Sequence, residues 1–283
     1  MSESGKDRET TAAQALLDGL IDATAFLSRL PVWRLKRDPH TLPDFARSAP
    51  LFPLAGLAIG LIPAFLLLVF AATNLPAALV ALVTIGSLIV ITGALHEDGL
   101  TDVADGFFGG ATLEKRLAIM RDSTIGTYGA LALMLSVALR VGCLAALLLV
   151  LDPLNTACIV LAIAAISRAA TLYPWALLPA ARPSDGPETA NRMKNQAGLS
   201  ARYGVPTRSD LHRAMLCSLP AVLLLLIATS LIATLFALVL AAVGTLGATS
   251  LARRHIGGHT GDVLGATQQS AELALYFALA ALM

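Results

Sequence analysis

Long apolar stretches separated by short polar segments dominate the chain. Six stretches are almost wholly apolar, at about 51–73, 76–95, 127–151, 154–181, 219–251 and 264–283. Most have the roughly 20 residues that a helix needs to cross ~30 Å of hydrocarbon. The fifth would measure ~50 Å as one helix, which is too long for one crossing and short for two. The pattern predicts an all-α, polytopic integral membrane protein.

The Lys and Arg residues indicate how often the chain crosses, because short loops rich in these residues stay in the cytoplasm. Most of the 20 Lys and Arg residues lie in four segments: before residue 50, in 96–126, in 182–218 and at Arg253 and Arg254. The connections near residues 74 and 152 carry none. All four basic segments face one side only if the fifth stretch crosses twice, turning between Thr229 and Thr234. We therefore expect about seven transmembrane helices, or six if 219–251 is a single span, with the C-terminus outside.

An amphipathic helix is predicted before the first span. Residues 11–30 place Leu, Ile and Phe at helical spacing among Asp and Arg, which favours a helix lying on the membrane surface. We expect one membrane domain over 1–283. Its polar parts would be a cytoplasmic or interfacial segment at 1–50, an acidic active-site loop at 96–126 and a cytoplasmic loop at 182–218.

Composition agrees with a lipid-embedded chain and excludes other classes. The 283 residues are 56% hydrophobic and 14% charged, with a mean hydropathy of +0.73. These values lie outside the ordinary soluble range. The net charge of +1 gives no basic field for nucleic acid. Cys143, Cys158 and Cys217 have no paired spacing, so neither a disulfide framework nor a zinc site is expected.

An acidic stretch directly follows the second apolar run. Asp98, Asp102 and Asp105 lie at i, i+4 and i+7, so on a helix they share one face. Three close carboxylates repel one another unless a cation lies between them, most simply a hard divalent ion with oxygen ligands. The alternative is a solvated acidic helix end.

Two further polar motifs fall on the same predicted side. A glycine-rich turn at 257–265 leads into the last span, and its backbone N–H groups could bind phosphate oxygens, with Asp262 available to a metal ion. Before the third span, Arg121, Asp122 and Ser123 could bind phosphate and metal. Structurally, Ser123 could instead cap a helix and Asp122 interact with its dipole.

Two arginines lie inside apolar stretches, where an unpaired cation is costly. Arg140 and Arg168 therefore need partners or mark a pathway, and Glu272 in the last stretch is a candidate partner. Taken together, the residues indicate a cytoplasm-facing Mg²⁺ site for a diphosphate. The chemistry would be substitution at phosphorus or loss of a diphosphate leaving group.

The sequence resembles the cobalamin synthase family, the adenosylcobinamide-GDP ribazoletransferases. The residues that carry the resemblance are His96, Asp98, Gly99, Leu100, Asp102, Asp105 and Gly106, then 119–123, 126–127 and Gly129, then 257–258, 260–262 and 264–266, with 26–32 and 52–56 near the N-terminus. They span nearly the whole chain in the family's order. One departure is Gln269, where relatives often carry Glu.

The resemblance implies a reaction and a location. The protein would transfer the adenosylcobinamide-phosphate moiety of adenosylcobinamide-GDP to α-ribazole or α-ribazole 5'-phosphate. The products would be GMP and adenosylcobalamin or its 5'-phosphate, which completes nucleotide-loop assembly in vitamin B12 (cobalamin) biosynthesis. We expect a multi-pass protein of the bacterial or archaeal inner membrane whose active site faces the cytoplasm. A homo-oligomer, or association with other corrinoid-assembly enzymes, is a further expectation.

The resemblance also implies roles for the candidate residues. The metal ligands for Mg²⁺ would be Asp98, Asp102, Asp105, Asp122 and Asp262. Catalysis would use Asp105 as the favoured proton acceptor, together with Asp102 and Arg121. The substrate's phosphates would be bound by Ser123, Arg168, Gly258, Thr260 and Gly261.

Two other functions remain open on the residues alone. A membrane Mg²⁺-dependent prenyltransferase also places Asp-rich helices around a diphosphate, but it usually has two similar Asp-rich motifs. A cation transporter would use the intramembrane carboxylates as a pathway. That function requires acids near the middle of the membrane, whereas Asp98 and Asp102 follow the end of an apolar run.

Overall fold

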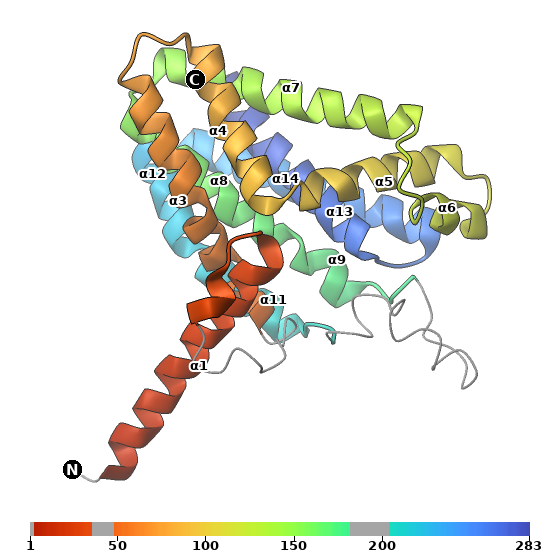
Figure 1. Ribbon diagram of the computed structural model, residues 1–283, viewed down its shortest axis with the longest axis horizontal. Helices are drawn as coiled ribbons and strands as arrows, with labels where there is room; N and C mark the ends of the chain where they lie inside the picture. Colours follow the sequence, from red (N-terminus) through yellow and green to blue (C-terminus); the bar gives the residue numbers. More distant parts are fainter. Residues whose placement is uncertain (1–2, 36–47, 182–203) are drawn as a thin grey trace.

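The computed structural model describes residues 3–35, 48–181 and 204–283 (Figure 1). The regular elements in these ranges are helices. They are α1 (Glu3–Leu27), η1 (Val32–Leu35), η2 (Ala49–Leu51), α3 (Phe52–Ala71), α4 (Ala77–Thr92), α5 (Leu95–Gly109), α6 (Leu113–Ile119), α7 (Thr127–Val150), α8 (Pro153–Ala170), α9 (Leu172–Leu177), α11 (Arg208–Cys217), α12 (Leu219–Ala228), α13 (Leu231–Ile256) and α14 (Gly261–Leu282). The predicted all-α membrane class is confirmed.

The described residues contain five or six candidate membrane spans. Within the described ranges, five helical segments are long and apolar enough to cross a membrane: Ala49–Ala71, Thr127–Val150, Pro153–Leu177, Arg208–Ala228 and Leu231–Ile256. The bent pair α4 and α5 can add a sixth. Helix α14, predicted as the last span, is not among them because buried polar residues interrupt its apolar sequence. The seven-span count and the outside C-terminus stay predictions.

The long fifth apolar stretch is divided in two, as its length predicted. Helix α12 ends at Ala228 and α13 begins at Leu231, and Ser230 caps α13 by accepting a hydrogen bond from the Ala233 N–H (3.1 Å). The first of the two candidate spans begins at Arg208. It therefore starts inside the predicted 182–218 loop, of which residues 182–203 lie outside the described ranges.

Helix α8 forms the centre of the bundle. In the candidate span Pro153–Leu177, which joins α8 to α9, 72% of the most apolar part is buried, and α8 packs on α3, α12 and α14. Small residues allow the close approach of α3: a Cβ added at Gly60 would lie 3.1 Å from the Ala164 Cβ. A main core of aliphatic side chains fills this part of the bundle, including Leu67, Leu144 and Leu275.

The N-terminal helix is attached to the bundle through its second half. Helix α1 projects away from the other helices at its N-terminal end (Figure 1). Near its C-terminus, Phe26 stacks on Phe52 of α3 and Trp175 of α9, with ring centroids 5.5 and 6.3 Å apart. Leu16 and Leu17 are 62% and 50% exposed, whereas Leu27 is buried. One apolar surface thus packs on the bundle and another is left exposed, consistent with the predicted amphipathic helix.

Candidate functional site

The acidic stretch is a helix that turns sharply out of the preceding one. Gly93 and Ala94 both have left-handed backbone conformations (φ +65° and +56°), and α5 runs at 86° to α4 (Figure 1). The turn is closed by a hydrogen bond from the Ala94 N–H to the Ile89 carbonyl (2.9 Å). Arg29 packs over Gly93, where a Cβ would lie only 2.5 Å from the Arg29 Nε. The predicted 96–126 loop therefore consists largely of two helices, α5 and α6.

The three aspartates of α5 have different surroundings. Asp98 is exposed, Asp102 is half-buried and Asp105 is buried. The Asp105 carboxylate accepts hydrogen bonds from the N–H groups of Gly126 (2.7 Å) and Gly129 (2.9 Å). These are the unpaired donors at the start of α7, so Asp105 caps that helix from another element.

Ser123 does not cap the third span, which was the structural alternative for this residue. Gly126 occupies the N-cap position of α7, three residues further along the chain, and Asp105 supplies the acceptor. Arg121, Asp122 and Ser123 are all exposed in the linker between α6 and α7. The Asp122 carboxylate accepts hydrogen bonds from the Thr124 hydroxyl (2.8 Å) and N–H (3.0 Å), which lower its pKa.

The start of α14 packs directly against α5. A Cβ added at Gly99 would lie 2.7 Å from the Asp262 carbonyl oxygen and 3.2 Å from the Gly265 Cα. The two helices therefore meet backbone to backbone, with Asp262 beside the turn that carries Asp98 and Asp102. Thr260 caps α14 by accepting from the Val263 N–H (3.3 Å), and its hydroxyl donates to Asp262 Oδ2 (3.1 Å).

The glycine-rich turn before α14 is anchored to the segment that follows α9. His259 forms a parallel bridge with Ala180, with hydrogen bonds from the His259 N–H to the Pro179 carbonyl (2.8 Å) and from the Ala181 N–H to the His259 carbonyl (3.0 Å). A Cβ at Gly258 would lie 2.7 Å from the Ala181 N, so this glycine allows the two segments to approach. Gly261, by contrast, is exposed, and a Cβ there would meet no heavy atom within 4 Å.

Helix α6 is bonded both to the end of α5 and to the end of α13. Arg116 donates from Nε to the Gly110 carbonyl (2.9 Å) and from Nη1 to the His255 carbonyl at the end of α13 (2.9 Å). The Phe107 ring of α5 stacks on His255 with centroids 4.9 Å apart. The three polar motifs predicted to share one side therefore lie together.

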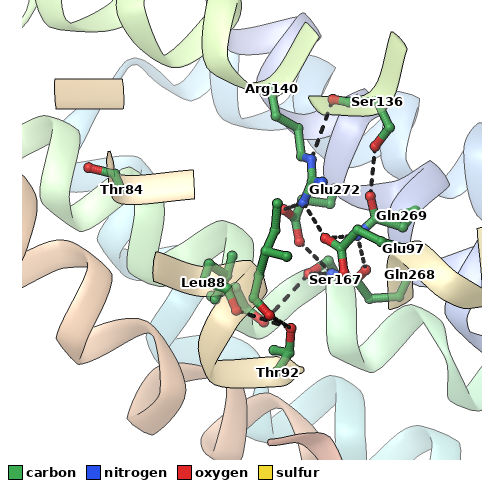
Figure 2. Close-up of polar contacts among 12 residues, drawn as sticks. Thr84, Leu88, Thr92, Glu97, Ser136, Arg140, Ser167, Gln268, Gln269 and Glu272 are labelled. Carbon is green, nitrogen blue, oxygen red and sulfur yellow. Dashed lines mark hydrogen bonds and ion pairs between the residues drawn. The ribbon is translucent and has the colours of Figure 1, made fainter. Parts of the chain in front are cut away.

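A buried polar cluster lies behind the acidic helix (Figure 2). Arg140 Nη1 donates to Glu97 Oε1 (2.8 Å) and Glu272 Oε1 (3.1 Å), which confirms the predicted partnership of Arg140 and Glu272. The cluster is extended by Ser136, Ser167, Gln268 and Gln269. Arg168 is also buried, at 1% exposure, with Nη1 donating to the Ala164 carbonyl (2.7 Å).

Glu97 and the glutamines were not predicted as site residues. The sequence signals were present: Glu97 lies two residues after the end of an apolar run, and two adjacent glutamines interrupt the last apolar run. A polar residue inside an apolar stretch requires a partner. Sequence spacing alone could not show that the partners come from α5, α7 and α14.

The carboxylates predicted to bind Mg²⁺ do not form a closed site. Among the described residues, no three His, Cys, Asp or Glu side chains gather closely enough to hold a metal ion. Asp98 and Asp102 nevertheless lie one turn apart on α5, with Asp262 on the facing helix. Mg²⁺ commonly takes one or two protein carboxylates and completes its shell with water and substrate phosphates. The residues fit this mode of binding and not a closed protein cage.

Most of the chain is similar to known proteins of one family. The sequence profile of the cobalamin-5-phosphate synthase family matches residues 19–280. The chain belongs to this family. Curated relatives include the adenosylcobinamide-GDP ribazoletransferases of Rhizobium etli, 41% identical over 91% of this chain and 94% of the relative, and of Sinorhizobium medicae, 40% identical over 95% and 98%. The enzyme of that name from Azorhizobium caulinodans is 44% identical over 89% of this chain and 91% of its own. No solved structure matches.

Three of the motifs that carried the resemblance lie in α5, at the α6–α7 linker and at the turn from α13 to α14. The structure brings them together at one end of the bundle. Neither a prenyltransferase nor a transporter is named among these relatives.

Proposed function

We propose that the protein transfers the adenosylcobinamide-phosphate moiety of adenosylcobinamide-GDP to α-ribazole or α-ribazole 5'-phosphate, with release of GMP. Its relatives are named for this activity, and the chain is similar to them over nearly their whole length. The structural observation that carries the proposal is the meeting of α5 and α14 at Gly99. There the backbone of α5, next to Asp98 and one turn before Asp102, packs on the backbone of Asp262.

The substrate's diphosphate would lie at this junction. Backbone N–H groups at a helix N-terminus favour a negative charge, and Gly261 at the first position of α14 leaves room for one. Thr260 and Gly261 would contact phosphate oxygens, with Arg121 and Ser123 approaching from the exposed α6–α7 linker. Gly258 would act indirectly by holding the turn against Pro179 and Ala181.

Mg²⁺ is the cofactor that this donor set suits. Asp98, Asp102 and Asp262 would hold it together with the diphosphate, and Asp122 is exposed in the neighbouring linker. When bound, the ion would neutralise charge on the transferred phosphoryl group and on the leaving GMP. The chain's own contribution is to hold the diphosphate in line with the incoming hydroxyl.

The reaction would form one P–O bond and break another. The ribazole hydroxyl oxygen attacks the phosphorus nearer the corrinoid, the bond to the GMP oxygen breaks, and the hydroxyl proton passes to a carboxylate. Both Asp105 oxygens already accept backbone N–H groups, so we assign the proton to Asp98, which is exposed. Arg168 is buried beside Glu97 and Glu272, and we assign it to charge balance inside the bundle.

The location follows from the same proposal. The apolar helices make this a membrane protein. We infer an inner-membrane protein with the α5–α14 junction facing the cytoplasm, where a nucleotide-activated substrate is available. Association with a second copy, or with other corrinoid-assembly enzymes, is part of this proposal.

Release of GMP tests the function directly. Purified protein in detergent or lipid nanodiscs, given adenosylcobinamide-GDP, α-ribazole and Mg²⁺, is expected to release one GMP for each corrinoid product. Omitting α-ribazole should abolish GMP release. Folded protein that releases no GMP with either ribazole would refute the proposal.

A further inference from the structure

An ion-pair cluster inside the bundle joins the first turn of α5 to α7 and α14. Arg140 of α7 is fully buried and donates to Glu97 of α5 and to Glu272 of α14, which are 4% and 1% exposed (Figure 2). Gln269 also donates to the Glu97 Oε1 that Arg140 binds, at 3.2 Å. None of these residues has a role in the proposed reaction.

The cluster is not arranged for stability alone. Burying charges costs several kcal/mol for each ion, and apolar residues of similar volume are often as stable. Two buried atoms of this cluster, Glu97 Oε2 and Arg140 Nη2, also have no hydrogen-bond partner among the described residues. A cluster that leaves such atoms unsatisfied is better explained by a geometric requirement than by a gain in stability.

The position of Glu97 in α5 indicates what that requirement is. Residues before and after Asp98 point about 100° to either side of it on a helix. Glu97 on one side is bound by Arg140, and Gly99 on the other side lies against Asp262 and Gly265. The two contacts together fix the rotation of α5 about its own axis.

The joint before α5 makes such a restraint necessary. Gly93 and Ala94 form a two-residue left-handed turn between helices at 86°, so the chain direction of α5 is not fixed by a continuous helix. A rotation of α5 would carry Asp98 and Asp102 along an arc away from the start of α14. A carboxylate pair that shares a metal ion tolerates displacements of only a fraction of an ångström.

We propose that Glu97 is a positioning residue, which through Arg140 sets the rotation of α5 and thereby the place of Asp98 and Asp102 relative to α14. The geometric part stands on the contacts alone. Its consequence for the reaction rests on the proposed function. Glu272 of α14 binds the same guanidinium, and its hydrogen bonds among the described residues come from Arg140 of α7 and Gln268 of its own helix.

Distances between spin labels test the geometric part without any enzymatic assay. The three native cysteines are replaced by alanine, and labels are placed at Phe108 of α5 and Leu149 of α7, which are 60% and 78% exposed. Glu97→Gln is expected to shift or broaden the distance distribution. The matched control Glu272→Gln also removes one carboxylate from Arg140 and should lower the thermal stability comparably, but it should leave the distribution unchanged.

Kinetics test the functional part. Glu97→Gln should raise the Mg²⁺ concentration that gives half-maximal GMP release by about tenfold, the size of effect seen when support for a metal ligand is removed. It should lower kcat more than it changes KM for α-ribazole. Glu272→Gln should leave the Mg²⁺ requirement near that of the parent. Unchanged distances and an unchanged Mg²⁺ requirement in Glu97→Gln would overturn the proposal.

A milder pair of variants covers the case in which Glu97→Gln does not fold. Gln269→Leu removes one hydrogen bond from Glu97 without changing charge, and Gln268→Leu is its control because Gln268 donates to Ser167 and Glu272 instead. Only Gln269→Leu should broaden the distribution. Equal distributions in both variants would refute the positioning role. If the parent releases no GMP, the proposed function fails, while the distances still decide whether Glu97 fixes α5.

Discussion

The carboxylate of Asp105 holds the first turn of α7 at Gly126, with Oδ2 2.7 Å from the Gly126 nitrogen. The acceptor comes from α5, whereas a helix is usually capped by the residue that precedes it. A Cβ added at Gly126 would lie 2.5 Å from Asp105 Oδ1, so a side chain there would push the carboxylate away from the N–H groups that it accepts from. The contact ties the acidic helix to a candidate membrane span.

Asp105→Ala is therefore expected to lower the stability of the protein, by about 0.5–2 kcal/mol if the loss resembles that of an ordinary N-cap. GMP release should fall as well, because α5 loses its anchor on α7. Thermal unfolding in detergent and the GMP assay measure the two effects. Asp152→Ala is the control, since Asp152 caps α8 through the Leu154 and Asn155 N–H groups. It should reduce stability while activity at a permissive temperature is retained. Full stability with lost activity in Asp105→Ala would instead support the sequence-based prediction of a catalytic base.

Gly99→Ala should separate α5 from α14. The new Cβ would lie 2.7 Å from the Asp262 carbonyl oxygen, and a backbone atom cannot move aside as a flexible side chain can. We expect a loss of about 1–3 kcal/mol, typical of overpacking, and a large fall in GMP release. The control is Gly142→Ala in α7, where a Cβ meets no heavy atom within 4 Å. That change should be neutral or stabilising, by up to about 1 kcal/mol. Equal behaviour of the two variants in unfolding and activity assays would contradict the close packing.

Features that follow from physical limits along the chain could be predicted from the sequence. The thickness of a bilayer predicted the break between α12 and α13, since a single helix over that stretch would be too long. The cost of an unpaired cation in an apolar segment predicted a partner for Arg140. Lys and Arg placement predicted that the acidic stretch and the turn at 257–265 would share one side, and the contact at Gly99 brings them together.

The contacts between helices and the angle between α4 and α5 could not be predicted from the sequence. The left-handed conformation of Ala94 has no local signal, because alanine rarely adopts it, and so the 86° turn was hidden inside an apolar run. Helical spacing placed Asp98 and Asp105 on one face, but it could not show that α7 covers one and leaves the other exposed. The glycine at 258 suggested a phosphate turn, whereas its lack of a side chain serves packing on Ala181.

The metal ligands can be distinguished by their Mg²⁺ dependence. Asp98→Asn, Asp102→Asn and Asp262→Asn should each reduce GMP release by at least about tenfold, and higher Mg²⁺ should restore part of it when only one ligand is lost. Asp210→Asn serves as a control, because Asp210 interacts within its own helix with Thr207 and Arg213. Near-normal activity of all three variants at saturating Mg²⁺ would show that the carboxylates at the α5–α14 junction do not bind the ion.

His259 should make the turn before α14 sensitive to acid. Burial lowers the pKa of His259 below its usual value, while its Nδ1 lies 2.9 Å from the Leu178 carbonyl. The unfolded chain therefore binds a proton at higher pH than the folded one. The stability contributed by neutral His259 is complete above the unfolded pKa of about 6.5 and is lost as the pH falls below it.

Thermal unfolding in detergent between pH 5 and pH 7.5 should consequently show a decrease in melting temperature on the acid side. Hydrogen exchange should show earlier exposure of the amides of His259 and Ala181, which hold the two segments together. His259→Asn is the matched variant, since its side-chain amide can donate to Leu178 but does not titrate. Its melting temperature should depend less on pH over this range. An identical pH dependence in parent and variant would assign the acid sensitivity to another group.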